Sequence, residues 1–152
     1  MDKKYVIVGT IILIIAIVAV GVATLIVSEN DEYKTEILNA YNNYYGNDTN
    51  SSDTIIFMEK AQNSTDNQTE KEYAELMTKW LNLQVEYSYY VLLIMEGNIT
   101  STDPLVQEPM KEMEIITEKI QKLLDENPEF KAKLHSWGMD KYPFIPDGIE
   151  DW

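Results

Sequence analysis

The chain contains no cysteine and no arginine, and its only histidine is His135. Without cysteine it forms no disulfide, uses no thiolate nucleophile and binds no metal through sulfur. A single histidine argues against the zinc and iron sites that need several imidazoles. Twelve lysines stand against 26 acidic residues, for a net charge of −14, which argues against the clustered basic surface needed for nucleic acid. We therefore expect no cofactor and no nucleic-acid partner.

The motifs of common enzyme classes are also missing. The sequence has no Gly-x-Ser-x-Gly, no glycine-rich phosphate loop and no His-Glu-x-x-His. Adjacent residues on a helix point about 100° apart, so His135 and Ser136 cannot pair as base and nucleophile. We expect no enzyme. A hydrolase acting through paired carboxylates is the last alternative, and it needs two carboxyl groups facing each other at about 5–9 Å.

One long uncharged segment, residues 5–27, consists mostly of Ile, Val, Leu and Ala. A helix of this length spans roughly 35 Å, enough for a bilayer core of about 30 Å. Lys3 and Lys4 precede it and acidic residues follow. The positive-inside rule therefore predicts that residues 1–4 are cytoplasmic, that residues 5–27 form a signal-anchor helix, and that the chain from residue 28 lies outside the cytoplasm, at the cell membrane.

The alternative for this segment is a cleaved secretory signal. Small residues at positions 21–23 would suit cleavage before Thr24. However, the apolar run is longer than the 7–15 residues of a signal peptide's apolar region, so we expect the anchor to be retained.

A stripe of small residues within the segment offers a possible contact in the membrane. They recur about every seven residues and share one helical face, on which another helix could approach closely: Gly9, Ala16, Ala19 and Ala23. This pattern predicts a homodimer or a partner helix, although alanine and glycine are common enough in spans to occur so by chance.

Acceptor sequences for N-glycosylation agree with an external location. Chance predicts about one Asn-x-Ser/Thr in such a composition. Five occur, all in segments expected to be loops: Asn47, Asn50, Asn63, Asn67 and Asn98. We expect a glycoprotein; the alternative is a set of polar loops with chance matches.

The remaining chain predicts helices, beginning with one long helix over residues 66–96. Its seam of apolar residues has spacings of three and four: Tyr73, Leu76, Trp80, Leu83, Tyr87, Tyr90 and Ile94. A capping box begun by Thr65 or Thr69 is expected at its start, and Gly97 at its end. Because residues 89–95 are apolar on all sides, we expect this end to be central and covered.

Shorter patterns complete the domain. Similar spacing predicts helices at residues 33–44 and 53–62. A further helix either begins at Pro104 and is kinked by Pro109, or begins near Glu108. Asn127 is expected to cap the last helix and Gly138 to end it. The aromatic tail, residues 139–152, is expected to be extended and to pack back on the bundle. The predicted fold is all-α: a single N-terminal transmembrane helix followed by an extracytoplasmic bundle of four or five helices, residues 28–138.

Two motifs could bind a ligand. Residues 48–59 have the oxygen spacing of an EF-hand calcium loop, but Asp53 stands where its sharp turn requires glycine, so a polar interhelical loop is favoured. Asn82, Glu86, Tyr87 and Tyr90 could line a pocket beside the seam. A buried Glu86 would indicate a ligand site, whereas an exposed one, which we expect, would not.

These observations predict a single-pass membrane protein whose acidic helical domain mediates protein–protein contact. It would be a cell-surface structural protein or an accessory subunit of a membrane complex. The alternative is an extracytoplasmic, sensor-like module that binds a small molecule or Ca²⁺ between its helices.

Overall fold

The computed structural model describes residues 31–46 and 51–146, which form five helices and no strand. The all-α prediction is confirmed for this part of the chain. The predicted anchor 5–27, with its small-residue face, lies outside the described residues. Within the described ranges, no helix is both long and apolar enough to cross a bilayer. The helices are α2 (Asp31–Tyr45), α3 (Ser51–Asn63), α4 (Gln68–Met95), α5 (Pro104–Glu126) and α6 (Pro128–Ser136).

The long helix α4 begins at a different cap from the one predicted. The side-chain Oδ1 of Asn67 accepts hydrogen bonds from the backbone N–H of Thr69 at 3.0 Å and of Glu70 at 3.2 Å. The expected capping box at Thr65 or Thr69 is therefore wrong. An asparagine at this position satisfies two free N–H groups of the first turn without a second side chain.

Replacing Asn67 separates its capping role from its role as a glycan acceptor. We expect Asn67→Ala to lower the free energy of unfolding by about 1 kcal/mol, because it removes the cap. Asn67→Asp also removes the glycan acceptor but keeps a capping oxygen, so its stability should stay close to that of the parent chain. Urea unfolding of both full-length variants measures this, and equal losses for Ala and Asp would contradict the capping role.

Two glycines end helices as the sequence predicts. Gly97 and Gly138 have φ angles of 77° and 80°, a left-handed conformation that favours glycine. After α4, the N–H of Asn98 donates to the carbonyl of Leu93 at 2.9 Å, and after α6 the N–H of Met139 donates to Leu134 at 3.2 Å. These bonds satisfy carbonyls that the helix ends would leave unpaired.

Helix α5 runs continuously through Pro109, so the alternative start near Glu108 is wrong. Asp103 caps the helix, its Oδ1 accepting from the N–H of Leu105 at 3.0 Å, and Pro104 occupies the first turn. Pro109 is buried inside the helix. A proline in the second turn removes only one early hydrogen bond, and the cap before it keeps the first turn helical.

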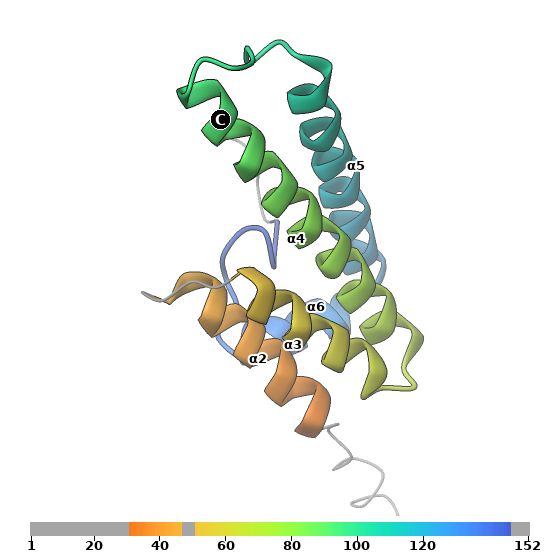
Figure 1. Cartoon of the computed structure of the whole chain (residues 1–152). Helices are drawn as coiled ribbons and strands as arrows, with labels where there is room; N and C mark the ends of the chain where they lie inside the picture. The colour runs from red at the N-terminus through yellow and green to blue at the C-terminus, as the bar shows by residue number, and fades with distance from the viewer. Residues whose placement is uncertain (1–30, 47–50, 147–152) are drawn as a thin grey trace, which may run out of the picture. The chain divides into compact units, whose positions relative to one another are not determined.

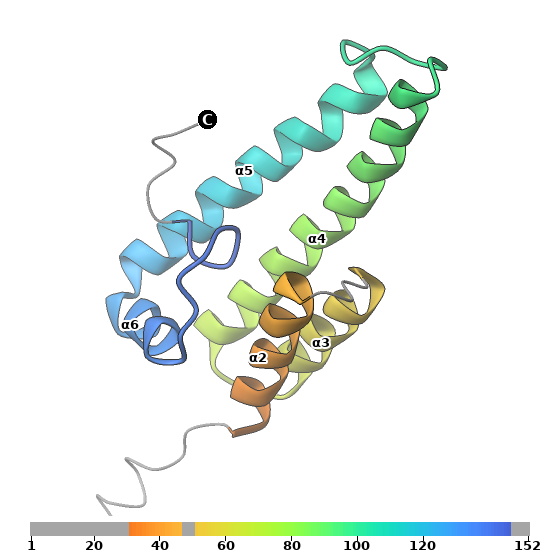
Figure 2. The same ribbon diagram turned by 90° about the vertical axis from the view of Figure 1, so that its left-hand side faces the viewer.

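The core surrounds the N-terminal half of α4, and α2, α3, α5 and α6 all contribute buried residues to it (Figures 1 and 2). The tail packs onto this core over residues 139–146. Phe144 and Ile145 are buried, and the hydroxyl of Tyr73 donates to the carbonyl of Phe144 at 2.9 Å. The predicted return of the tail is thus confirmed for these residues, although they form a turn, with the Ile145 N–H donating to Lys141, and are not fully extended.

The C-terminal half of α4 contradicts the sequence prediction. Residues 89–95 were expected to be central, yet Tyr89, Leu92 and Met95 are exposed. Here α4 and α5 form a two-helix hairpin that extends beyond α2, α3 and α6 (Figures 1 and 2). The apolar pattern correctly predicts a helix here, but it does not predict which elements pack against it. The shorter helices pack only along the first half of α4.

Two buried tyrosines predict loss of stability in alkali. Burial raises the pKa of Tyr33 and of Tyr73 well above the ordinary 10.0, and for Tyr33 the neighbouring Tyr73 and Glu70 add to the effect. The unfolded chain therefore loses these protons first. Stability should be complete below about pH 10 and should fall as the pH rises above it.

The variant Tyr33→Phe tests this expectation. It removes a hydrogen bond of 2.9 Å from the hydroxyl to the carbonyl of Glu70, so we expect a loss of about 1 kcal/mol at pH 7. The difference from the parent chain should shrink above pH 10, because the variant has one ionisable buried phenol fewer. Denaturant unfolding across pH 7–11 gives the two curves, and a constant difference would contradict the prediction.

Candidate interaction surface

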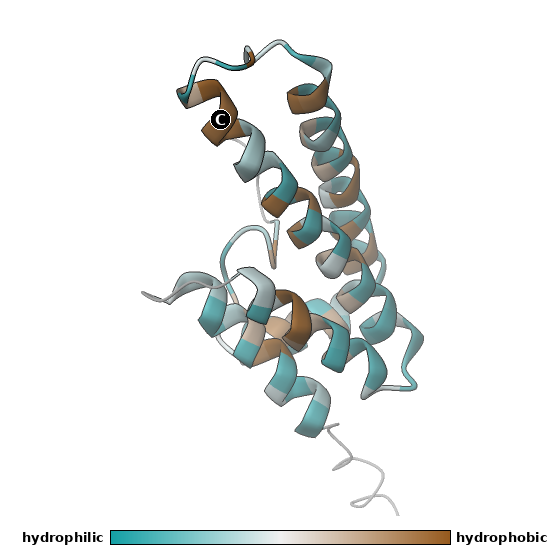
Figure 3. Cartoon of the chain, in the orientation of Figure 1, coloured by the Kyte–Doolittle hydropathy of each residue, from teal (hydrophilic) through white to brown (hydrophobic). Residues whose placement is uncertain are grey.

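One face of the C-terminal half of α4 is apolar and uncovered. Its side chains recur at spacings of four, three and three residues, and we call them the uncovered stripe: Val85, Tyr89, Leu92 and Met95. Tyr89 and Leu92 are each 58% exposed and Met95 is 79% exposed. Figure 3 shows apolar turns continuing to the end of α4. Such side chains in a row along one helix are typical of a contact surface rather than of scattered surface residues.

The uncovered stripe continues a face that another helix covers further down. In the first half of α4, Ala74, Met77 and Leu81 are buried, and α3 packs against α4 there. At 100° per residue, Leu81 and Val85 lie close to one line along the helix, as do Leu81 and Leu92. Helix α3 therefore covers only the N-terminal part of a single apolar face of α4.

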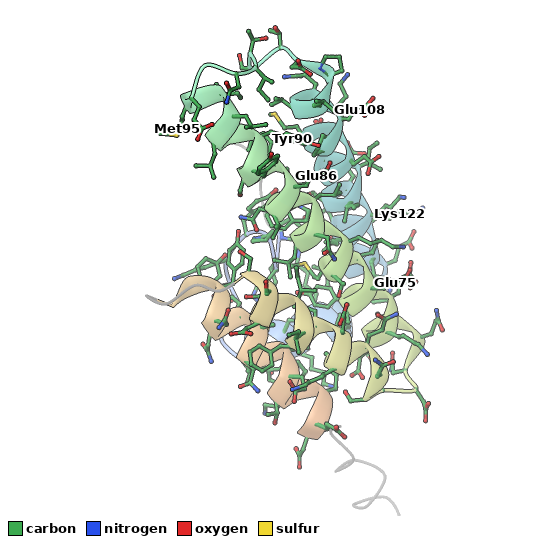
Figure 4. All side chains as sticks on the ribbon, in the orientation of Figure 1. Glu75, Glu86, Tyr90, Met95, Glu108 and Lys122 are labelled. Carbon is green, nitrogen blue, oxygen red and sulfur yellow. The ribbon has the colours of Figure 1, made fainter. Side chains whose placement is uncertain are left out.

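Around the uncovered stripe, every charged residue in the chain segment 81–109 is acidic. Between Trp80 and Met110 the chain has no lysine, arginine or histidine, and it has four carboxylates: Glu86, Glu96, Asp103 and Glu108. On α4, the hydroxyl of Tyr90 donates to Oε1 of Glu86 at 3.0 Å. That hydrogen bond raises the pKa of Tyr90, and Glu108 on α5 adds to the shift. Figure 4 shows Glu86 and Tyr90 together on α4, with Met95 pointing away from α5.

The residues that the sequence suggested as a pocket lie on the surface of this hairpin. Glu86 and Asn82 are exposed, and Tyr87 and Tyr90 are half-buried. The amide of Asn82 donates back to the carbonyl of Thr78 at 2.9 Å, along its own helix. The condition for a ligand pocket, a buried Glu86, is not met.

Three of the five predicted glycan acceptors lie among the described residues, and all three are exposed: Asn63, Asn67 and Asn98. Asn63 is the last residue of α3 and not part of a loop, and its amide donates to Glu59 at 2.8 Å. Asn67 caps α4 through Oδ1, which leaves the cap compatible with a glycan on Nδ2. Asn47 and Asn50 fall outside the described residues.

The EF-hand-like spacing does not form a calcium loop. Residues 51–59 belong to α3, whereas the loop would need them to wrap around the ion. Thr54 faces inward and its hydroxyl donates to Oδ1 of Asn43 on α2 at 2.7 Å. Across the part of the chain that the structure describes, no group of three His, Asp or Glu side chains is placed to hold a metal.

A polar cavity that the sequence did not predict lies between the start of α4 and the start of α6. Its volume is about 390 Å³, and Glu70 and Lys133 are among its lining residues. The carboxylate of Glu70 is buried. Its Oε2 accepts from the hydroxyl of Thr65 at 2.5 Å and its Oε1 from Nζ of Lys133 at 2.7 Å.

This pairing joins residues 63 positions apart, so no local pattern could indicate it. Two further acids, Glu126 and Glu129, also line the cavity. Asn127 lines it as well, and its Oδ1 accepts from the hydroxyl of Thr69 at 3.2 Å. Because the lysine that lines the cavity is already paired with Glu70, we assign this site a structural role. The ion pair between Glu70 and Lys133 joins α4 to α6.

Comparison with known proteins finds no match among protein-family models, curated proteins or solved structures.

Proposed function

We propose that this chain is a membrane-anchored extracytoplasmic protein whose helical domain mediates contact with another protein. The observation that carries the proposal is the uncovered stripe. An α-helical hairpin that leaves Tyr89, Leu92 and Met95 in water gains hydrophobic stabilisation when a partner covers them, roughly 25 cal/mol for each Å² of apolar surface removed from water.

The sequence before the helical domain supports the proposed anchor. Residues 5–27 have the length and composition of a membrane span, and three residues separate them in sequence from the start of α2.

The membrane orientation can be tested with protease on cells that make the protein. With a tag after Trp152, protease added to intact cells, or to cells stripped of any wall, should remove the tag. Endoglycosidase should shift the band if the exposed acceptors Asn63, Asn67 and Asn98 are used. A tag that survives in intact cells and is lost only after the cells are opened would contradict the orientation.

The contact itself can be tested on gently solubilised native membranes. The full chain should migrate on a native gel in a complex much larger than its 17.6 kDa. Leu92→Ser should release it from that complex. Ile115→Ser is the matched control, because Ile115 is an exposed residue of similar size on α5 outside the uncovered stripe. Equal migration of the two variants would contradict a contact through the stripe.

A further inference from the structure

We infer that the occupant of the uncovered stripe is an amphipathic helix of a different protein, apolar along one face and bearing Lys or Arg at its margins. The inference rests on the proposed function, because it names the chemistry of the partner that the same surface takes. Two independent properties of the hairpin carry it: the helical geometry of the apolar face and the sign of the charge around it.

The geometry points to a helix because the same face of α4 already takes one. Helix α3 covers its lower part, placing Met58 and Ala61 in the core with Met77 and Leu81 of α4. Above Leu81, the stripe keeps the same helical period. Side chains at spacings of three and four form ridges and grooves that fit those of another helix, whereas a strand presents side chains every second residue. A docked helix would complete a three-helix bundle with α4 and α5.

The charge points to a basic partner. Glu86 on α4 and Glu96, the residue that caps the end of α4, lie within one turn of stripe residues. Residues 80–110 contain four carboxylates and no basic residue, and the next lysine along the chain is Lys111. A helix with lysine or arginine beside its apolar residues would pair with these carboxylates at the rim. Such complementary charge accelerates association and selects against partners of the wrong sign.

The same charge disfavours two other occupants. A second copy of this chain would bring a net charge of −14 and an identical acidic hairpin to the interface, so the rims would repel each other. A bilayer with anionic lipids would repel the hairpin in the same way.

Site-specific photo-crosslinking of the full chain in its native membrane tests the inference. A photoreactive leucine analogue placed at Leu92 should crosslink to one protein. Mass spectrometry should locate the link in a segment with net positive charge and apolar residues at spacings of three and four. The same analogue at Ile115 is the matched control, and we expect it to give about fivefold less of that product.

Charge reversal separates the basic helix from any other protein partner. The double variant Glu86→Lys/Glu96→Lys should lower the yield at Leu92 about tenfold at physiological salt. The control Glu114→Lys/Glu118→Lys changes net charge equally at exposed positions of α5 outside residues 80–110, and it should keep the yield within about twofold. Equal yields from the two double variants would overturn a basic partner.

The possible products distinguish failure of the inference from failure of the proposed function. A crosslink to a second copy of the chain, or to an acidic or non-helical segment of another protein, overturns the inference and leaves a protein contact at the stripe. A crosslink to lipid alone, or no product at Leu92, overturns both.

Discussion

Replacing Lys133 by methionine is expected to lower the free energy of unfolding by about 3 kcal/mol. The ammonium lies 2.7 Å from Oε1 of Glu70, whose side chain is only 6% exposed. Without it, the buried carboxylate keeps the hydroxyl of Thr65 as its one side-chain donor among the described residues. Removing one partner of a buried ion pair leaves an uncompensated charge, which costs more than the pair itself contributes. Because the lysine side chain is 30% exposed, water can replace part of it, which places the loss at the lower end of the usual range.

Urea unfolding of the full chain, followed by near-ultraviolet circular dichroism, measures the loss. Adding Glu70→Gln to Lys133→Met should restore most of the stability, because a neutral amide can still accept from Thr65 without needing a cation. The matched control is Lys79→Met. Its pair with Glu75 is exposed on both sides, so the change should be under about 0.5 kcal/mol. A loss at Lys133 no greater than at Lys79 would contradict the role of the buried pair.

We expect Phe144→Ala to lower the free energy of unfolding by about 4 kcal/mol. The tail should therefore be as important for stability as a core helix. Phe144 is fully buried, and its ring lies 5.2 Å from that of Tyr41 and 5.7 Å from that of Tyr44, both edge-on. Truncation to alanine loses the buried apolar surface and leaves a cavity that the surrounding rings can only partly fill.

The same denaturant titration tests this second expectation. Leu105→Ala is the control, because Leu105 is 51% exposed on α5 and its truncation should change stability by about 0.5 kcal/mol or less. A loss below about 1 kcal/mol for Phe144→Ala would mean that the tail is not part of the folded core in solution.

Much of the fold could be predicted because the sequence signals of a helix lie within a short stretch of the chain. The spacing of Tyr73, Leu76 and Trp80 predicts α4 and its buried face, and Gly97 and Gly138 predict helix ends, since each signal is complete within a few residues. The cap at Asn67 was missed for a different reason. Four residues of the capping types Thr, Asp and Asn occur within residues 65–69, and only the backbone angles decide between them.

The candidate surface could be predicted only in part. The spacing of Tyr89, Leu92 and Met95 predicts that they share one apolar face of a helix. It does not predict whether another part of the same chain covers that face. Here the missing cover depends on how far α3, whose last residue leads into the start of α4, extends alongside α4 (Figure 1). The pair of Glu70 and Lys133 is likewise a long-range contact that no local pattern contains. The exposure of this face follows from the arrangement of the helices in space and not from the sequence of α4 alone.

The most direct test of the account is the oxidation of Met95 in native membranes. In the purified full chain in nanodiscs, Met95, which is 79% exposed, should be oxidised by dilute peroxide far faster than the buried Met77. In native membranes a bound partner should slow oxidation of Met95 about fivefold or more, whereas exposed Met110 on α5 keeps its rate. An equal rate at Met95 in both preparations would contradict the claim that this surface is an interface.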